Sequence, residues 1–418
     1  MAVACPPRRV SWRPCARRVS RFIVSELPCD TAANARATVA VAVTFFAQAV
    51  LFASWTAHIP NVEATLRLSD GTLGSALLGL PIGSVTAMVL SGWLLPRLGS
   101  RSMIRISIAG YALAGIGVGM ADSAVALFAA LFFWGLMQGA VDVSMNTQAV
   151  TVEQARGRPI MSRLHGMWSL GGFAGALVGA GAVAAGIGLT VQLTVLGIVA
   201  AVAVEALSRN LIGDSGASGD RVSAPRRGPR LSAVVLVLGG VAFASMLCEG
   251  AAADWSAAYL RNELGTTAAT AGFGYAAFAL AMVSMRFSGT GLQRRFAPTV
   301  LLPVLALVFA CGMGGALIIR EPIAALAGFV CMGIGLGLVV PSAFSAAGRR
   351  ATESNAGPSI AAVAALGWCG FVSGPPAIGH LADVVGLGNA LWVLPALAVL
   401  LAVVVRFSGA FSEPGVRN

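Results

Sequence analysis

The chain has 418 residues, of which 57% are hydrophobic and only 11% are charged. Its mean hydropathy of +0.82 excludes a water-soluble globular protein. At about 20 apolar residues per membrane-spanning helix, this length accommodates about twelve spans and no separate catalytic domain. The net charge of +11 comes entirely from Arg, since the chain has no Lys. In a membrane protein, that charge indicates orientation rather than a nucleic-acid partner.

Residues 1–36 carry seven Arg and lack an uninterrupted apolar run. This excludes a secretory signal and a membrane span, and it predicts a disordered basic arm in the cytosol. The arm could touch anionic lipid headgroups. An over-extended gene start is an equally good explanation of it.

Apolar segments with short polar breaks follow from Ala37 onward. A break rich in Ser, Gly, Pro and Arg at 208–231 predicts a cytosolic linker between an N-terminal half, 37–207, and a C-terminal half, 232–407, followed by a tail at 408–418. The predicted spans are 37–58, 70–94, 103–121, 123–147, 160–184, 187–207, 232–257, 268–292, 299–318, 323–345, 358–379 and 387–406. The expected fold is therefore an all-α polytopic membrane protein with twelve transmembrane helices in two six-helix bundles.

The positions of the Arg residues test this arrangement, because cytosolic segments of membrane proteins are enriched in basic residues. If both termini are cytosolic, 24 of the 28 Arg residues fall on the cytosolic side. Only Arg67, Arg261 and Arg320 fall outside, and Arg286 falls within a span. We therefore expect a multi-pass protein of a bacterial plasma membrane with both termini in the cytosol.

Matching glycines support an internal duplication. Gly135 and Gly139 match Gly333 and Gly337 at an offset of 198 residues, and Gly172 matches Gly370 at the same offset. The ends of the second and eighth spans match at an offset of 197. A shared offset over three helix pairs predicts pseudo-symmetric halves.

Two six-helix halves joined by a basic linker resemble the major facilitator superfamily. The run from Gly92 to Arg101, GWLLPRLGSR, is similar to that family's signature between spans 2 and 3, with Pro96 in place of its acid. Gln138 and Gly139 resemble a second family pattern, in which Gly135 replaces an Arg.

Within that superfamily, the chain resembles the fucose permease and the YbjJ-like branch near it. Asp142 and Asn146 resemble an acid and Asn of the permease, and the run from Arg286 to Pro298 resembles its exit from span 8. Further segments that look like the YbjJ-like branch are Ala53–Trp55, His165–Gly171, Glu249–Trp255 and Ser373–Pro376. The resemblance implies a solute transporter that works by alternating access.

Gln138, Asp142 and Asn146 recur every four residues, so they form one polar stripe along the predicted fourth span. A charge in hydrocarbon costs about 2.5–3.5 kcal/mol on insertion scales, which predicts that the stripe faces a central cavity. Removal from water favours the protonated carboxyl, so Asp142 could exchange a proton. The permease resemblance also implies proton coupling at this acid. The alternative is a structural pair with an Arg at the cytosolic end of the helix.

Glu249 is the second candidate for proton coupling, because small neighbours leave space around its carboxyl, although they could equally serve close helix packing. His165 and Ser169 lie one turn apart and could contact substrate. The resemblance places His165 at a sugar-contacting position, and the alternative is a solvated His at a helix start.

Arg286 requires an anionic partner or a water-filled niche, and that partner could be Asp142 or an acid of its own half. We expect it, together with Arg97 and Arg294, to be structural or part of a gate. Gln48 and Trp55 are further candidates for the substrate cavity.

The remaining polar and aromatic groups near helix ends are given simpler interpretations. Trp255 and Tyr259 are expected in an interfacial aromatic belt, and Asp254 is expected to be an interfacial acid. His58 and His380 are assigned no specific role. The seven Cys are expected to be reduced, and their spacing predicts no metal site.

The expected function is secondary active transport of a small polar organic solute, such as a sugar or related metabolite, by proton symport. The alternatives are a proton-driven exporter of drugs or metabolites and a receptor that no longer transports. An enzyme is not expected, because no nucleophile triad, metal cluster or phosphate loop is present in the sequence. The expected partners are the solute, protons and the lipid bilayer, for a monomer without a cofactor.

Overall fold

The computed structural model describes residues 32–157, 160–213, 232–350 and 356–412. All regular elements within these ranges are helical, and twelve helices there are long and apolar enough to cross a membrane. This confirms the predicted all-α fold with twelve spans. Nearly all of the predicted arm, most of the linker and most of the tail lie outside the described residues.

The first bundle contains six spans and one short connecting helix. Its second span is broken at Leu78, because Pro81 has no N–H to donate to the carbonyl of Leu77. The elements are α1 (Ala32–Thr56), α2 (Ile59–Leu66), α3 (Asp70–Leu77), α4 (Gly79–Leu98), α5 (Ser100–Gly119), α6 (Ala124–Arg156), α7 (Met161–Ala184) and α8 (Leu189–Ser208).

The second bundle also has a broken span: the helix of the tenth span is interrupted at Gly337, four residues before Pro341. Its first helix continues into one π-helical turn. The elements are α9 (Ala233–Ala258), η1 (Tyr259–Glu263), α10 (Ala268–Arg295), α11 (Pro298–Ile319), α12 (Pro322–Leu336), α13 (Val339–Arg350), α14 (Ala356–Val385), α15 (Leu387–Ala390) and α16 (Val393–Phe407).

Several predicted boundaries were wrong. The first helix begins at Ala32 rather than at residue 37, α6 continues to Arg156 rather than ending at residue 147, and α14 continues to Val385 rather than ending at residue 379. The extension of α6 is polar, but it is anchored: the Gln148 amide donates to Ser100 Oγ, and Glu153 accepts from the backbone of the segment that begins α7. Hydropathy marks only the apolar part of such a helix.

The repeated glycines are positions of close helix packing. A Cβ at Gly135 would strike the backbone of Leu80 on α4, and a Cβ at Gly333 would strike the backbone of Phe278 on α10. Only glycine permits this approach, so the two halves use matched glycines at equivalent crossings. Gly172 has open space around it, whereas its neighbour Gly171 packs against α1.

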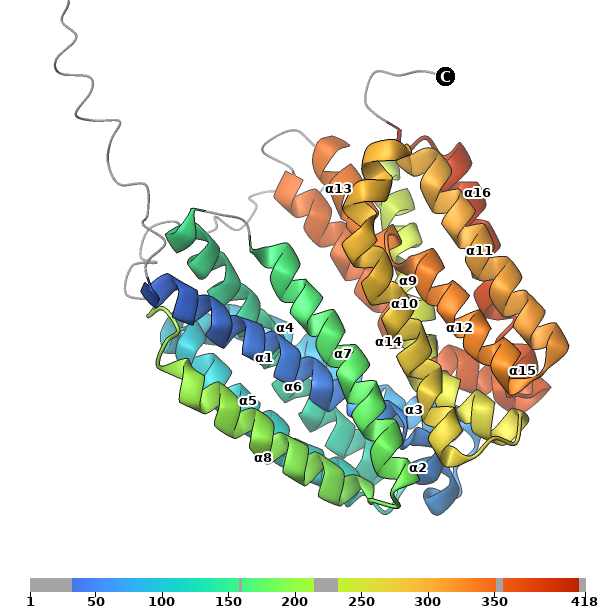
Figure 1. The fold of residues 1–418 in the computed structure, drawn as a ribbon, viewed down its shortest axis with the longest axis horizontal. Coiled ribbons are helices and arrows are strands. Elements are labelled where there is room, and N and C mark those ends of the chain that lie inside the picture. The colour runs from blue at the N-terminus through green and yellow to red at the C-terminus, as the bar shows by residue number, and fades with distance from the viewer. Residues whose placement is uncertain (1–31, 158–159, 214–231, 351–355, 413–418) are drawn as a thin grey trace, which may run out of the picture.

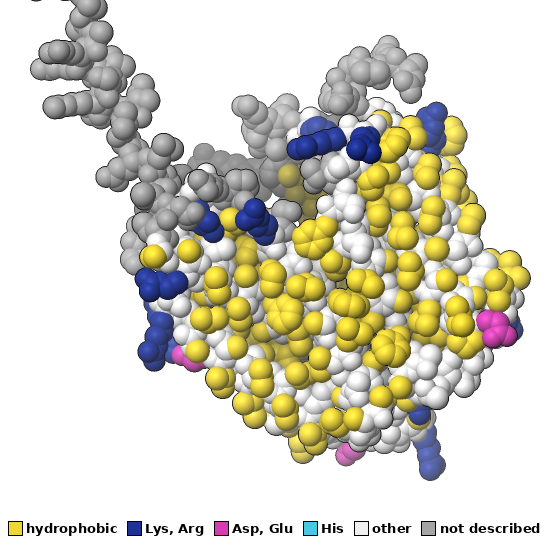
Figure 2. All heavy atoms as spheres, in the orientation of Figure 1, with side chains coloured by type: hydrophobic (Ala, Val, Ile, Leu, Met, Phe, Trp, Pro, Cys, Tyr) yellow, Lys and Arg dark blue, Asp and Glu magenta, His cyan; other side chains and the backbone are white. Residues whose placement is uncertain are grey.

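The two bundles stand side by side, with the N-terminal bundle in blue and green and the C-terminal bundle in yellow to red (Figure 1). We call the end at which α1 begins and α16 ends the terminal face, and the opposite end, which holds α2 and α3, the α3 face. At the α3 face, α3 packs on α14, and deeper in the bundle α7 packs along α10. Hydrophobic side chains spread over the middle of the visible face (Figure 2), as a surface against lipid requires.

Candidate functional site

Arg286 of α10 is the centre of a polar link between the two halves. Its Nη2 lies 3.7 Å from Glu249 Oε2 of α9, in the same half. Its Nη1 donates to Ser169 Oγ of α7, in the other half, at 3.1 Å. The predicted gate residue therefore has Glu249 as its anionic partner, rather than Asp142.

The neighbours of this link orient its acceptors. Ser169 donates its hydroxyl to the carbonyl of His165 at 3.1 Å, which leaves the hydroxyl oxygen free to accept from Arg286. Ser245 lies one turn before Glu249 and donates to its Oε1 at 3.5 Å. Arg286 Nε has no hydrogen-bond partner among the described residues. One donor of the guanidinium is thus buried without an acceptor in this conformation.

His165 and Gln48 lie where α1 packs on α7. The His165 ring meets Phe45 edge to face, with the ring centroids 5.4 Å apart, and its side chain is exposed. Gln48 is buried, and its Oε1 accepts from Trp168 Nε1 at 2.6 Å. Gln48 therefore joins two helices within one half.

The polar stripe of α6 is present, and each of its three side chains is partly buried. Asn146 Nδ2 donates to the carbonyl of Asp142 at 2.8 Å and lies 3.4 Å from its Oδ1. Gln138 Oε1 is buried without a hydrogen-bond partner in the described part of the chain. Asp142 forms no ion pair with any described residue, so the expected alternative of a structural Arg pair finds no support there.

Arg97 and Arg294 are both exposed and lie near the terminal face. Arg97 donates to the carbonyl of Trp93 on its own helix and lies over that ring, with Cζ 3.9 Å from the centroid. Within the described ranges, neither Arg makes a hydrogen bond or ion pair with the opposite half. Their assignment to a gate is not supported by such a contact.

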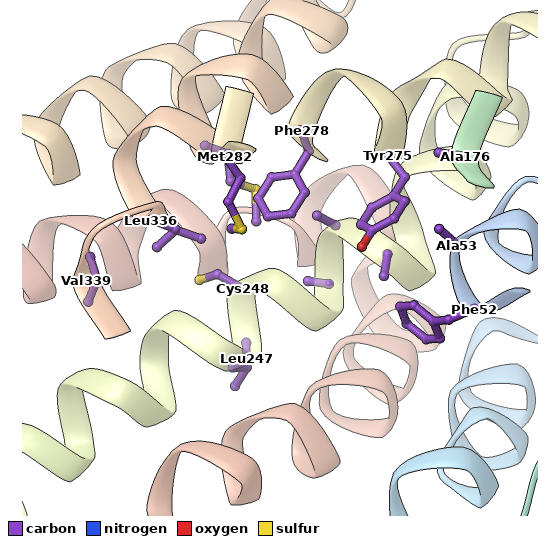
Figure 3. Packing of buried hydrophobic residues seen from close by; sticks show 14 of the residues in the cluster. Phe52, Ala53, Ala176, Leu247, Cys248, Tyr275, Phe278, Met282, Leu336 and Val339 are labelled. Carbon is purple, nitrogen blue, oxygen red and sulfur yellow. The ribbon is translucent and has the colours of Figure 1, made fainter. Parts of the chain in front are cut away.

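Three interpretations of the seventh span were wrong. Trp255 and Tyr259 are 0% and 1% exposed, so they belong to the protein interior and not to an interfacial belt. Asp254 lines a narrow cavity between the halves together with Trp55. These interpretations failed because α9 lies centrally and packs against helices of both bundles. Nearby, the hydroxyl of Tyr275 points from α10 into the space between α9 and α1, where Phe52 lies (Figure 3).

The α3 face holds a set of contacts that the sequence did not reveal. Asp383 of α14 accepts from the backbone N–H of Gly71 at 3.0 Å and from Ser69 Oγ at 3.2 Å, both at the start of α3. His380 Nε2 lies 3.0 Å from Ser75 Oγ. We call these contacts the α3–α14 clasp. The pattern Ser69-Asp70-Gly71-Thr72 signals a helix start, but it does not signal a partner 312 residues away.

The helix connection beside the clasp strengthens this face. Arg261 donates to Asn61, and Asn262 donates to Glu63 at 3.0 Å, so η1 is tied to α2. His58, to which no role was assigned, is buried and bonds through Nε2 to Gln192 Oε1 at 2.8 Å. Burial lowers the pKa of His58, which favours the neutral ring.

Metal chemistry finds no support in the described ranges. They contain no group of three or more His, Cys, Asp or Glu side chains placed to hold an ion. The described cysteines, Cys248, Cys311, Cys331 and Cys369, are free thiols.

Comparison with known proteins places this architecture in a family. Residues 40–369 match the model of the Major Facilitator Superfamily. An uncharacterised MFS-type transporter of Yersinia pestis is 32% identical over 375 residues, covering 88% of this chain and 94% of the relative. The membrane protein MosC of Rhizobium meliloti is 31% identical over 363 residues, covering 87% and 88% respectively.

Solved structures share the fold at low sequence identity. The nucleoside transporter NupG superposes with a TM-score of 0.74 at 13% identity, covering 90% of this chain and all of the other. The D-xylose-proton symporter superposes with a TM-score of 0.69 at 13% identity, covering 90% and 98%. The chain therefore belongs to the major facilitator superfamily and is a membrane transporter rather than an enzyme.

Proposed function

We propose that this transporter moves a small polar organic solute, sugar-like or related in its hydroxyl chemistry, by proton symport with alternating access. Its resemblance to the fucose permease and the YbjJ-like branch belongs to the same proposal. In this proposal, the solute contacts Gln48, Trp55, Gln138, Asn146, His165 and Ser169. Asp142 and Glu249 bind the proton, and Arg286 is part of the gate.

The observation that carries the proposal is the link from Glu249 through Arg286 to Ser169. Alternating access requires the halves to move against each other, and this link crosses between them inside the membrane. The guanidinium keeps one donor, Nε, without a described partner. A solute rich in hydroxyl groups could accept from it when the link to Ser169 breaks.

Asp142 supports the proton component. Its carboxyl is partly buried and has no ion-pair partner in the described part of the protein, which leaves it free to exchange a proton. The names of two structural neighbours, a nucleoside transporter and a D-xylose-proton symporter, agree with hydroxyl-bearing solutes and with proton coupling.

Counterflow in proteoliposomes tests this function. A panel of labelled sugars, polyols and nucleosides is first screened for thermal stabilisation of the purified protein, and the stabilising solutes are then assayed for exchange. We expect uptake to exceed equilibrium when the proton gradient points inward and to stop when the gradient is reversed. Accumulation only when the proton gradient points outward would identify a proton-driven exporter, and binding without exchange would identify a receptor.

We also propose that the terminal face, the linker at 208–231 and both termini lie in the cytosol of a bacterial cell, in a monomer. Arg side chains in Figure 2 lie mainly along the upper and left edges, toward the terminal face. In a background without reactive cysteines, we expect Asp122→Cys to react with an impermeant maleimide in intact cells and Ser218→Cys to react only after lysis. Asp122 is exposed at the α3 face. Labelling of Ser218→Cys from outside would reverse the orientation.

A further inference from the structure

A narrow cavity lies between the two halves near the α3 face. Its empty volume is about 300 Å³, including space that opens to solvent, and the part in which the centre of a water molecule fits is only about 10 Å³. That is room for one water at most. Its walls come from α1, α3, α4 and α6 of the first half and from α9 and α14 of the second: Phe52, Trp55, Leu77, Leu80, Pro81, Leu131, Asp254, Phe371 and Pro375.

Asp254 differs in chemistry from the rest of the cavity lining. The other eight lining residues are aromatic, aliphatic or proline, so Asp254 contributes the one ionisable side chain of the lining. It forms no hydrogen bond or ion pair with any described side chain. Asp254 is partly buried, so an ionised carboxylate there has little water and no described counter-charge to stabilise it.

The α3–α14 clasp separates this cavity from the α3 face. Pro375 lines the cavity, and its carbonyl lies so close to Gly74 that a Cβ there would strike it. Farther out, a Cβ at Gly379 would strike the carbonyl of Asp70, and Asp383 bonds to the start of α3. Water from the α3 face therefore reaches Asp254 only when α3 and α14 separate.

We propose that Asp254 is a proton-binding residue of the α3-face gate: the gate closes over its neutral, protonated carboxyl, and the carboxyl ionises when the gate opens. Every closure would then trap one proton taken from the medium at the α3 face. This rests on the proposed transport function, and it adds a proton site distinct from Asp142.

The lining favours a proton over a metal cation. Hard cations such as Ca²⁺ and Mg²⁺ require about six or more oxygen ligands. The cavity offers one carboxyl group and space for one water. A proton needs no other ligand than the carboxyl itself.

Other charged and titratable groups lie near this gate, and they predict a different response. His380 and Asp383 belong to the clasp, and Asp70 lies beside it at the start of α3. Glu63, Arg261 and Glu263 belong to the α2 and η1 side. Tyr275 of α10 lies near Asp254, Glu249 and Arg286. Asp383 accepts hydrogen bonds from Gly71 and Ser69, so losing its negative charge would weaken the closed gate, whereas neutralising Asp254 stabilises it. The sign of the pH response therefore separates the two acids.

Spin-label distances measured between the halves test the proposal without a substrate. Labels at Ala64→Cys on α2 and Val384→Cys on α14 report gate opening, and both native side chains are exposed. In detergent, where one pH acts on both faces, we expect acidification from about pH 8 to about pH 5 to raise the closed-to-open ratio, by at most about tenfold per pH unit for one proton. Asp254→Asn mimics the neutral acid and should remain closed over the whole range.

Two further variants keep this test decisive. Asp254→Leu is also neutral and suits the apolar walls, so it should be closed and pH-independent even if the Asn variant folds poorly. Asp122→Asn should keep the wild-type pH response, because Asp122 is exposed and lies outside the cavity lining. A pH response that persists in Asp254→Asn, or a closure driven by Na⁺ at constant pH, would overturn the proposal. Absence of solute flux would refute the transport function and leave this distance response unchanged.

Discussion

Arg286→Ala is expected to reduce the amount of folded protein and to abolish accumulation of the solute. The substitution leaves Glu249 in the bundle without its cation and removes the bond to Ser169. Loss of the partner of a partly buried charged group destabilises a protein by about 1–3 kcal/mol. Fluorescence-detected size exclusion and thermal unfolding in detergent measure the first effect, and gradient-driven uptake measures the second.

A double variant separates the loss of the ion pair from the loss of the gate. Arg286→Ala with Glu249→Gln removes both charges, so it should recover much of the lost thermal stability without recovering transport. Ser169→Ala preserves the ion pair and breaks only the bond across the halves. It should fold normally and shift the distribution between open and closed states. If Arg286→Ala folds, binds and transports like the parent, Arg286 has no gate role.

The fold could be predicted because its determinants are periodic in the sequence. Twelve apolar segments require twelve helices, and the matched pairs Gly135 with Gly333 and Gly139 with Gly337 marked the duplication. In each half, these glycines lie where two helices cross closely. They can be recognised in the sequence because no larger residue fits at such a crossing.

The surroundings of individual side chains could be predicted less well. Asp254 lies about 140° around α9 from Glu249, which correctly indicates a different face of the helix. That angle does not reveal that α9 is enclosed by helices of both bundles, so the second face is interior as well. Trp255 was misassigned for the same reason, because hydropathy does not distinguish lipid from another helix as the neighbour of an apolar face.

Choices between distant partners also required the structure. Arg286 needed an acid, and both Asp142 and Glu249 satisfied the sequence argument. The structure selects Glu249, at 3.7 Å. Asp383 and Gly71 are separated by 312 residues, and only the meeting of α14 with α3 brings them together.

Asp142→Asn is expected to abolish solute accumulation while preserving exchange. In symport, the loaded carrier reorients with a neutral acid, and the empty carrier must first release its proton. Asn is close to Asp in size and is permanently neutral, so loaded reorientation continues and the return of the empty carrier fails. Counterflow needs only loaded reorientation, and accumulation needs both steps.

The measurement compares pH-gradient-driven uptake with counterflow in the same liposomes. We expect Asp142→Asn to exchange solute at near wild-type rates and to lose accumulation. Asp142→Ala should also weaken binding, because Asn146 loses the carboxyl oxygen that lies 3.4 Å from its amide. Accumulation at the wild-type level by the Asn variant would transfer the coupling role to Glu249 or Asp254. Loss of both activities would instead identify Asp142 as a structural acid of α6, since exchange does not require its proton to leave.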